Sequence, residues 1–481
     1  MAAVIPGSRG GFVDLAHLVT LTGLSDPVLR LISSLLIAYP LALFYRVFLY
    51  RGNPTVQHIF FTATGLSITY YCYGLGTTHS VVNITLCYLL LLFGGPTTIT
   101  VVLSFILNMG YLLLGYTANA TGDYDVDWTT PHCVLCLRLI SLTWNYYDGH
   151  EPKEILSPDK TTALKKLPSI LEVFGNCYFC GGCVVGPLFP IKSYIDLVEG
   201  KLIDKKDDNN SCIPAGFLRF LGGIAYLGLH SGLAVVFSND YLLSDNFQTF
   251  SYWNKMWIIG VWGRVALMKY LGVWLTSEGS CIISGLGYNG KTEDGKLQWD
   301  GLRNMKLSIY EVSYTYQHIV DSFNINTNKW VFKYCFKRLR FLGNKHVSHF
   351  LTLMFLALWH GIFIGYFFAF FMEFLIIIME KQIFTMCVLI SKKRWSDLTA
   401  FSKAVLIAIQ WPIRFNGLGY CAVPFCLLSW DRIHRVYSIT YYTVPAVLAT
   451  WFILYPTVIA PLVKALAPRP PSDKEKLKKA E

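Results

Sequence analysis

Charged residues are scarce in this chain. Only 15% of its 481 residues are Asp, Glu, Lys or Arg, whereas 53% are hydrophobic, and the mean hydropathy is +0.43. This balance excludes a soluble protein of such length, because so much apolar surface needs lipid as its solvent. Apolar runs recur along the chain, each near the roughly 20 residues that a helix needs to cross a bilayer. The composition therefore predicts an all-α integral membrane protein with about 11 helical spans.

Acidic residues are scarcer than basic ones. The chain has 30 acidic and 41 basic residues, which gives a net charge of +11. The cations lie in short stretches between apolar runs, as is typical of cytoplasmic loops in membrane proteins. We therefore expect membrane lipids, and no nucleic acid, as partners.

Long polar segments are few. Residues 1–466 are expected to form one polytopic membrane domain, followed by a polar tail over residues 467–481. Spans are predicted near residues 27–49, 57–75, 81–93, 98–116, 133–144, 213–237, 253–274, 351–379, 405–411, 418–430 and 444–462, with a glycine-rich apolar stretch at 170–191. Residues 277–345 are polar, charged and aromatic, which predicts interfacial helices and loops that build a site. The absence of an internal repeat disfavours a secondary transporter.

The polar tail ends in Lys478, Lys479, Ala480 and Glu481. Lysines at the third and fourth positions from the end resemble the dilysine retrieval signal that cytosolic coat proteins bind. This pattern predicts an endoplasmic reticulum membrane protein with a cytosolic C-terminus. A lysine-rich solvated tail is the alternative, with about equal weight.

The thirteen cysteines form no extracellular disulfide framework, because several lie inside apolar runs. Cys177, Cys180 and Cys183 have CxxCxxC spacing, but neither a histidine nor a fourth cysteine is close by. Packing along a helix is therefore favoured over metal binding. Cys133 and Cys136 are interpreted in the same way, and no metal site is expected.

Several catalytic motifs are missing. The chain has no GxSxG motif, and none of its eleven histidines is followed five residues later by aspartate. Serine hydrolases and the acyltransferases that use an HxxxxD motif are thereby disfavoured. Residues 285–292 match the GxGxxG and GxxxxGK[ST] spellings, but a turn composition follows where a phosphate-binding helix would have to begin. This segment is predicted to be a loop.

Two histidines lie deep in apolar spans. His230 is flanked by Gly228, Ser231 and Gly232, which suits close helix packing, whereas His360 follows a strongly basic segment. An ionisable group in hydrocarbon is costly, so each histidine is a candidate functional residue, with a hydrogen bond to a neighbouring helix as the alternative.

The basic segment runs from Asn324 to Lys345 without an acidic residue. Its cations and interleaved aromatic rings suggest a surface that attracts a polyanion, or one that lies against anionic lipid headgroups. A desolvated imidazole beside such a surface tends to stay neutral and can accept a proton from a hydroxyl nucleophile. The candidate polyanion-binding residues are Lys333, Lys337, Arg338 and Arg340.

The segment from Trp359 to Tyr366 reads WHGIFIGY, that is, WHxxxxGY. This spelling resembles the histidine motif of the membrane-bound O-acyltransferase superfamily. In the phospholipid-remodelling branch a WD pair and an asparagine lie upstream, and here Trp299, Asp300 and Asn324 match them. Further matches are Lys269, Tyr270 and Trp274, whereas Ile364 stands where many members have proline.

This resemblance implies a helical bundle with interfacial helices around a central reaction chamber. It implies transfer of a fatty acyl group, often polyunsaturated, from acyl-CoA to the sn-2 hydroxyl of lysophospholipids with choline, ethanolamine or serine headgroups. His360 would act as general base, and Asn324 would bind the oxyanion or hold the substrate or imidazole. Trp299, Asp300 and Trp359 would contact substrate together with the basic residues above. The alternative for Asp300 is structural, because tryptophan and aspartate near a membrane interface can anchor a helix end.

On this interpretation acyl-CoA is a co-substrate, no cofactor is needed, and homo-oligomerisation is left open. Sterol, diacylglycerol or protein acceptors are the rival substrates within the superfamily. A transporter or receptor in which His360 lines a pathway is the non-enzymatic alternative.

Overall fold

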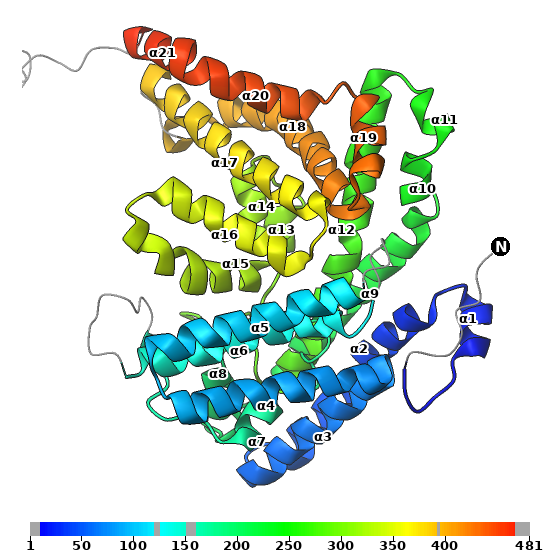
Figure 1. Cartoon of the computed structure of the whole chain (residues 1–481), viewed down its shortest axis with the longest axis vertical. Helices are drawn as coiled ribbons and strands as arrows, with labels where there is room; N and C mark the ends of the chain where they lie inside the picture. Colours follow the sequence, from blue (N-terminus) through cyan, green and yellow to red (C-terminus); the bar gives the residue numbers. More distant parts are fainter. Residues whose placement is uncertain (1–9, 120–125, 151–159, 392–394, 467–481) are drawn as a thin grey trace, which may run out of the picture.

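The computed structural model describes residues 10–119, 126–150, 160–391 and 395–466. Within these ranges the chain is helical, and its only β pairing is an isolated bridge between Lys291 and Leu297 (Figure 1). The polar tail, with Lys478 and Lys479, lies outside the described residues. The predicted all-α class is therefore confirmed for the part of the chain that can be described.

The first half of the chain supplies α1 to α12. Their bounds are α1 Ala16–Thr22, α2 Asp26–Phe44, α3 Pro54–Tyr73, α4 Thr77–Gly94, α5 Thr98–Ala118, α6 Thr129–Asp148, α7 Ile170–Cys177, α8 Ile191–Val198, α9 Cys212–Ala234, α10 Asn239–Leu242, α11 Asp245–Gln248 and α12 Tyr252–Ile283.

The second half supplies α13 to α21. Their bounds are α13 Leu307–Tyr310, α14 Tyr316–Ser322, α15 Ile325–Val331, α16 Lys345–His360, α17 Ile364–Ser391, α18 Ala400–Leu427, α19 Trp430–Ser438, α20 Thr443–Leu454 and α21 Ala460–Leu466. Short helices thus occupy much of residues 307–342, in agreement with the helices and loops predicted for this polar section.

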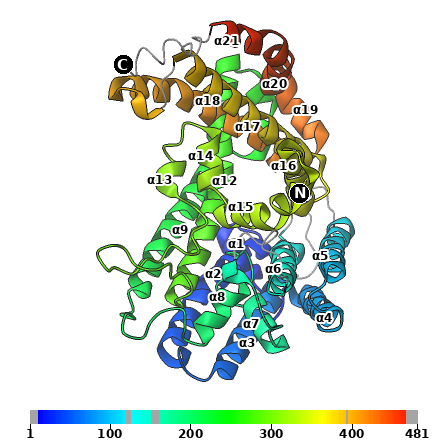
Figure 2. The same ribbon diagram turned by 90° about the vertical axis from the view of Figure 1, so that its left-hand side faces the viewer.

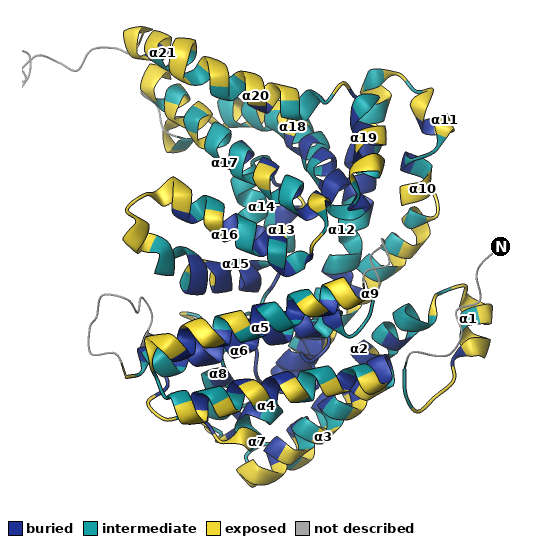
Figure 3. Cartoon of the chain, viewed as in Figure 1, coloured by how far each residue is buried: buried dark blue, intermediate teal, exposed yellow. Residues whose placement is uncertain are grey.

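Seven stretches among the described residues are long and apolar enough to cross a membrane. They are Asp26–Leu49, Pro54–Gly94, Thr98–Ala118, Cys212–Ala234, Tyr252–Ile283, Ile364–Ser391 and Thr443–Leu466. Apolar side chains are exposed on the outward faces of α4, α5, α17 and α21 (Figure 3), as expected for helices that contact lipid. A multi-span protein is therefore supported, whereas the number of eleven spans is not confirmed.

Three predicted spans have different boundaries in the structure. The run at 351–379 is broken after His360, because Gly361 has a φ of 146° and separates α16 from α17. The run at 405–411 and residues 418–427 of the next run belong to one helix, α18, which contains Pro412 and Pro424, whereas Trp430 begins α19. The stretch at 170–191 is helical only as far as Cys177, so it is not a span.

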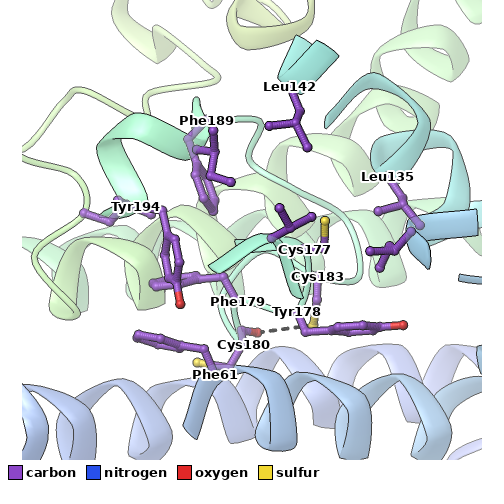
Figure 4. Packing of buried hydrophobic residues seen from close by; sticks show 14 of the residues in the cluster. Phe61, Leu135, Leu142, Cys177, Tyr178, Phe179, Cys180, Cys183, Phe189 and Tyr194 are labelled. Atoms are coloured by element: carbon purple, nitrogen blue, oxygen red, sulfur yellow. Dashed lines mark hydrogen bonds between the residues drawn. The ribbon is translucent and has the colours of Figure 1, made fainter. Parts of the chain in front are cut away.

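A tightly packed core fills the N-terminal region, where α3, α6, α7 and α8 meet. Phe61 stacks on Phe179 at 4.4 Å between ring centroids, and both rings are fully buried. Cys177, Cys180 and Cys183 lie in the same core (Figure 4). No cluster of three metal-ligating side chains occurs in the part of the chain that the structure describes. These cysteines therefore pack as small apolar residues.

The helices α9 and α12 pack closely and connect this region to the C-terminal helices. A side chain on Gly223 would lie 2.2 Å from the Thr276 hydroxyl, so the two backbones approach where only glycine fits. With 32 residues, α12 is about 48 Å long and reaches both regions. Figure 2 shows α12, α14, α15, α16 and α17 arranged in a ring.

Candidate active site

A chamber of about 1160 Å³ lies within this ring. It is lined by residues of α12 and of the consecutive helices α13 to α18, so seven helices contribute to one wall. Both His360 and Asn324 line it. The volume is that of a site for a large ligand rather than for a few water molecules.

The stripe of α16 that faces the chamber runs along the whole helix. It consists of Lys345, His346, His349, Thr352, Leu353, Leu356 and His360, at the spacing of one helical face. The chamber-facing stripe of α17 contains Phe370, Glu373, Ile377 and Lys381. On both helices a cation lies at one end of the stripe. At the other end of the stripe, α16 carries His360 and α17 carries Phe370. The Phe370 ring stacks on the His360 imidazole.

The imidazole of His360 is enclosed by aromatic rings. Phe370 stacks on it at 5.5 Å between centroids, while Trp359, Tyr366 and Phe425 contact it at 4.5, 5.6 and 5.1 Å. Among the described residues, none forms a hydrogen bond with either ring nitrogen. Packing therefore orients the ring and leaves its nitrogens available to a ligand in the chamber.

The backbone around His360 is anchored on both sides. The Trp359 carbonyl accepts a hydrogen bond of 2.8 Å from the Tyr116 hydroxyl, and the Trp359 indole donates one of 2.8 Å to the Cys133 carbonyl. Trp359 is itself buried and does not line the chamber. Its geometry is that of a residue that positions the end of α16, not of one that touches substrate.

The turn after His360 is held by α18. The Gly365 amide donates a 3.0 Å hydrogen bond to the Leu428 carbonyl, and a side chain on Gly365 would lie 2.1 Å from the Pro424 carbonyl oxygen. The second glycine of the WHxxxxGY motif is thus required for close backbone approach. Ile364, which stands where proline is common, is the first residue of α17.

Asn324 lies at the N-cap of α15 with a left-handed backbone, at φ 50° and ψ 45°. Its Oδ1 accepts a hydrogen bond of 3.3 Å from the Asn304 side-chain amide. The Asn304 carbonyl and Oδ1 accept hydrogen bonds from the amides of Ile325 and Asn326, at 3.0 and 2.9 Å. Asn304 therefore fixes both the backbone and the side chain at Asn324.

Asn304 is in turn held by α12. Its backbone amide lies 3.4 Å from a carboxylate oxygen of Glu278, which pairs with Arg219 at 3.0 Å. Because Asn324 uses its oxygen as an acceptor, its two amide N–H groups remain available, and the described residues offer them no other partner. Such a group can donate to a negative oxygen in the chamber.

The neighbouring asparagines use their amides elsewhere. Asn326 donates a 2.9 Å hydrogen bond to the Leu302 carbonyl, and Asn328 donates to the carbonyls of Val320 and Phe323 at 2.8 and 3.0 Å. Asn324 is therefore the asparagine of this segment whose donors are available to the chamber. This difference is a structural argument for assigning the motif asparagine to Asn324 rather than to its neighbours.

The WD pair lies outside the chamber lining. The Trp299 indole donates a 3.0 Å hydrogen bond to the Ser211 hydroxyl, and Asp300 accepts one of 2.9 Å from Asn289. Asp300 also lies 3.5 Å from Arg303. Both side chains hold the loop that precedes Asn304, so substrate contact by this pair has no geometric support.

The predicted polyanion-binding residues do not line the chamber either. Lys333 bonds to Thr162, Arg338 pairs with Asp148 at 2.6 Å, and Lys337 lies 4.8 Å from the Phe332 ring. Arg340 is exposed on the surface. The structure places all four outside the chamber lining, a difference from the expected substrate surface, and their contact with substrate stays a prediction. Tertiary pairing with residues far away in sequence explains the difference.

Four other lysines line the chamber instead. They are Lys306, Lys329, Lys345 and Lys381, and all four are exposed, which locates them at its opening. Only one exposed acid, Asp321, shares this lining among the described residues. The opening is therefore electropositive. Lys329 and Lys345 belong to the basic segment from Asn324 to Lys345, whereas Lys306 and Lys381 lie outside it and were not predicted from the sequence.

Other sequence candidates have clear positions. Tyr270 and Trp274 line the chamber from α12. His230 does not, and its Nδ1 lies 2.9 Å from the Val265 carbonyl on the adjacent helix, which supports the helix-packing interpretation. Residues 285–292 form part of a hairpin-like loop after α12, with the Gln298 amide donating to the Gly290 carbonyl at 2.9 Å. The loop prediction there is confirmed.

Comparison with known proteins bears directly on this site. The sequence profile of the MBOAT, membrane-bound O-acyltransferase family matches residues 113–421, which include Asn324, His360 and the chamber helices. The chain belongs to the membrane-bound O-acyltransferase family. Membership supports acyltransferase activity and agrees with the multi-span fold.

Relatives of this membrane-bound O-acyltransferase match it over nearly the whole chain. This chain is 42% identical to Lysophospholipid acyltransferase 5 of Bos taurus over 489 residues, which cover 100% of this chain and 98% of the relative. Identity to Lysophospholipid acyltransferase 5 of Homo sapiens is also 42%, with 98% and 96% coverage. The protein of the same name in Drosophila melanogaster is 36% identical, with 92% and 91% coverage.

Proposed function

We propose that this chain transfers a fatty acyl group from acyl-CoA to the free hydroxyl of a lysophospholipid. The observation that carries the proposal is that His360 and Asn324, each with unused hydrogen-bonding capacity, line one chamber of about 1160 Å³. Similarity over the full chain to proteins named lysophospholipid acyltransferase favours this acceptor over a sterol, diacylglycerol or protein.

The acyl donor is proposed from the charge of the opening. Lys345 and His360 lie fifteen positions apart on the same stripe of α16, which corresponds to about 22 Å along the helix. The phosphates of coenzyme A would contact the lysines at the opening, and the extended pantetheine arm would carry the thioester inward to His360. This arrangement supports acyl-CoA as a co-substrate without a further cofactor.

The proposed reaction is a direct transfer. His360 removes the proton from the lysophospholipid hydroxyl, whose oxygen attacks the thioester carbonyl carbon. Asn324 donates an N–H hydrogen bond to the oxyanion of the tetrahedral intermediate, where charge develops. The carbon–sulfur bond then breaks, and the imidazolium returns its proton to the coenzyme A thiolate. The products are a diacyl phospholipid and free coenzyme A.

The membrane arrangement is part of the same proposal. The seven apolar stretches become eleven crossings if α4 is counted apart from α3 and if α6, α16 and α18 also cross. Residues 1–466 would form the membrane domain, and residues 467–481 a cytosolic tail whose Lys478 and Lys479 retain the protein in the endoplasmic reticulum. A homo-oligomer is compatible with this arrangement.

One assay tests the proposed function. Membranes that contain the expressed protein receive lysophosphatidylcholine and an unsaturated acyl-CoA, and mass spectrometry follows the diacyl product. We expect product above the level of membranes without the protein. Inactivity towards lysophospholipids of every headgroup would refute the proposal. Full activity of His360→Ala would refute only the assignment of the base.

A further inference from the structure

One acidic side chain in the chamber is not used by the proposed reaction. Glu373 belongs to the chamber-facing stripe of α17, between Phe370 and Ile377. Among the described residues it has neither a hydrogen-bond partner nor an ion-pair partner. A carboxyl group inside a membrane-spanning helix is costly. A carboxyl group without a partner in such a helix is therefore a candidate for binding a ligand.

The other acids near the chamber are already paired. Asp321, the only other acidic lining residue, accepts a 3.0 Å hydrogen bond from the Gln317 side chain. Glu380 does not line the chamber, and it accepts hydrogen bonds of 2.8 and 3.0 Å from the amides of Tyr316 and Gln317. Glu373 is therefore the acid in this wall that is free to bind a cation.

No lysine of the chamber can neutralise Glu373 at close range. Lys381 is eight residues further along the same stripe, about 12 Å along the helix axis. That separation exceeds the reach of a close ion pair. An incoming ligand can supply the positive charge that no described residue brings within ion-pair distance of Glu373.

The distance from the reaction centre fits a lysophospholipid headgroup. Phe370 stacks on the His360 imidazole, and Glu373 follows Phe370 by three residues, or about 4.5 Å along α17. In these lysophospholipids the headgroup nitrogen is separated from the sn-2 oxygen by the glycerol C2 and C3, the phosphodiester and two headgroup carbons. A hydroxyl at His360 thus leaves the nitrogen within reach of the Glu373 carboxylate.

The chamber also offers aromatic surface to a cation. Phe370 and Tyr316 both line it, and quaternary ammonium groups bind on the faces of aromatic rings. A carboxylate combined with such rings distinguishes headgroups by charge. Choline, ethanolamine and serine headgroups carry a cationic nitrogen, whereas inositol and glycerol headgroups carry none.

We propose that Glu373 binds the cationic nitrogen of the lysophospholipid headgroup and thereby selects nitrogen-containing headgroups. This inference rests on the proposed function, because it assigns the acceptor headgroup to a place in the same chamber. It makes Glu373 a specificity-determining residue, distinct from the residues assigned to proton transfer and oxyanion binding.

The first test is a competition between headgroups. Membranes with wild-type protein or Glu373→Gln receive equal amounts of lysophosphatidylcholine and lysophosphatidylinositol with one acyl-CoA. We expect the variant to lower the ratio of choline to inositol product by about tenfold, through loss of the choline product alone. An unchanged ratio, or an equal fall of both products, would overturn the proposal. Asp245→Asn, which removes an exposed carboxylate on α11, is the matched control and should keep the wild-type ratio.

The second test measures binding without turnover. The purified protein in a maltoside detergent is titrated with dodecylphosphocholine and, separately, with dodecyl phosphate. Dodecylphosphocholine should bind the wild type about tenfold more tightly than Glu373→Gln, while dodecyl phosphate should bind both equally. Equal affinity of dodecylphosphocholine for both proteins would overturn the inference. Because this test needs no acyl transfer, it decides the role of Glu373 even if the proposed function fails.

Discussion

Deep polar residues behave differently in the N-terminal core and in the chamber. In the core, Arg138 on α6 donates hydrogen bonds to the carbonyls of Asn176, Cys177, Gly182 and Pro187, at 2.8 to 3.1 Å. In the chamber, by contrast, His360, Glu373 and the amide N–H groups of Asn324 have no partner among the described residues. Both regions bury polar groups, but four carbonyls of the fold hold the Arg138 guanidinium, whereas the three chamber groups face a large volume.

This difference shows why burial alone does not identify a functional residue. His132 is more deeply buried than His360, but its Nε2 lies 3.2 Å from the Asn83 amide and its ring packs on Tyr111. His132 therefore contributes to packing. Unused hydrogen-bonding capacity facing a large volume is the property that separates the reactive group from the structural one.

The largest expected effect is on catalysis at His360. The variant His360→Ala should lower the rate of acyl transfer by about 10²- to 10⁴-fold, the usual contribution of a general base, while the protein stays folded. Mass spectrometry of the diacyl product measures the rate, and thermal unfolding in detergent measures folding. His230→Ala is the matched control and should retain turnover, because the His230 imidazole bonds to the Val265 carbonyl of the neighbouring helix and does not line the chamber. Equal losses of acyl-transfer rate in the two variants would contradict the assignment of His360 as the reactive histidine.

The opposite effect is expected in the core. Arg138→Ala should destabilise the protein by several kcal/mol, because it leaves four buried carbonyls without donors, at about 1–3 kcal/mol each before relaxation. The loss should appear as a lower melting temperature or a lower yield of folded protein. Any fraction that folds should keep the wild-type KM. A variant that is stable but inactive would place Arg138 in the reaction instead.

A smaller effect is expected where the two regions meet. Asn304 holds Asn324 but does not line the chamber, so Asn304→Ala should lower kcat by about tenfold with little change in KM. Asn304→Asp retains the acceptor for the Asn326 amide but loses the donor to Asn324, so it should restore stability more than kcat. A change in KM alone would contradict the positioning role.

The smallest catalytic effect is expected at the opening. Lys345→Ala and Lys381→Ala should each raise the KM for acyl-CoA several-fold, and the effect should weaken as salt is added. Arg340→Ala is the control, because Arg340 is exposed but does not line the chamber. A larger rise in KM for Arg340→Ala than for the two lysine variants would favour the surface cations outside the chamber over the chamber lysines.

Much of the chamber could be predicted from the sequence where the signal is local. His360 was identified by an imidazole in an apolar run and by the WHxxxxGY spelling, and the polar section before it does contain short helices. The break at Gly361 was not predicted, because apolar composition continues across it while only the backbone changes direction. The pattern of apolar residues does not reveal such a change in backbone direction.

Tertiary pairing accounts for most of the rest. The basic residues Lys333 and Arg338 contact Thr162 and Asp148, more than 150 positions away, and no spacing rule reveals that. Lys329 and Lys381 meet in one lining for the same reason. Glu373 was visible as a polar residue in an apolar span, but its role depends on which helix face meets the chamber.

The turn between α16 and α17 has a consequence for the unfolded chain. Ile364 is the first residue of α17, where the helical φ is close to the value that proline imposes, and its amide has no backbone partner among the described residues. In the unfolded chain, isoleucine allows the backbone of this turn many conformations, whereas proline would allow few. Ile364→Pro should therefore raise the free energy of unfolding by about 0.4–1 kcal/mol, which thermal unfolding can measure. We expect the same native turn with either residue. The two proteins would then differ only in the conformational entropy that is lost on folding.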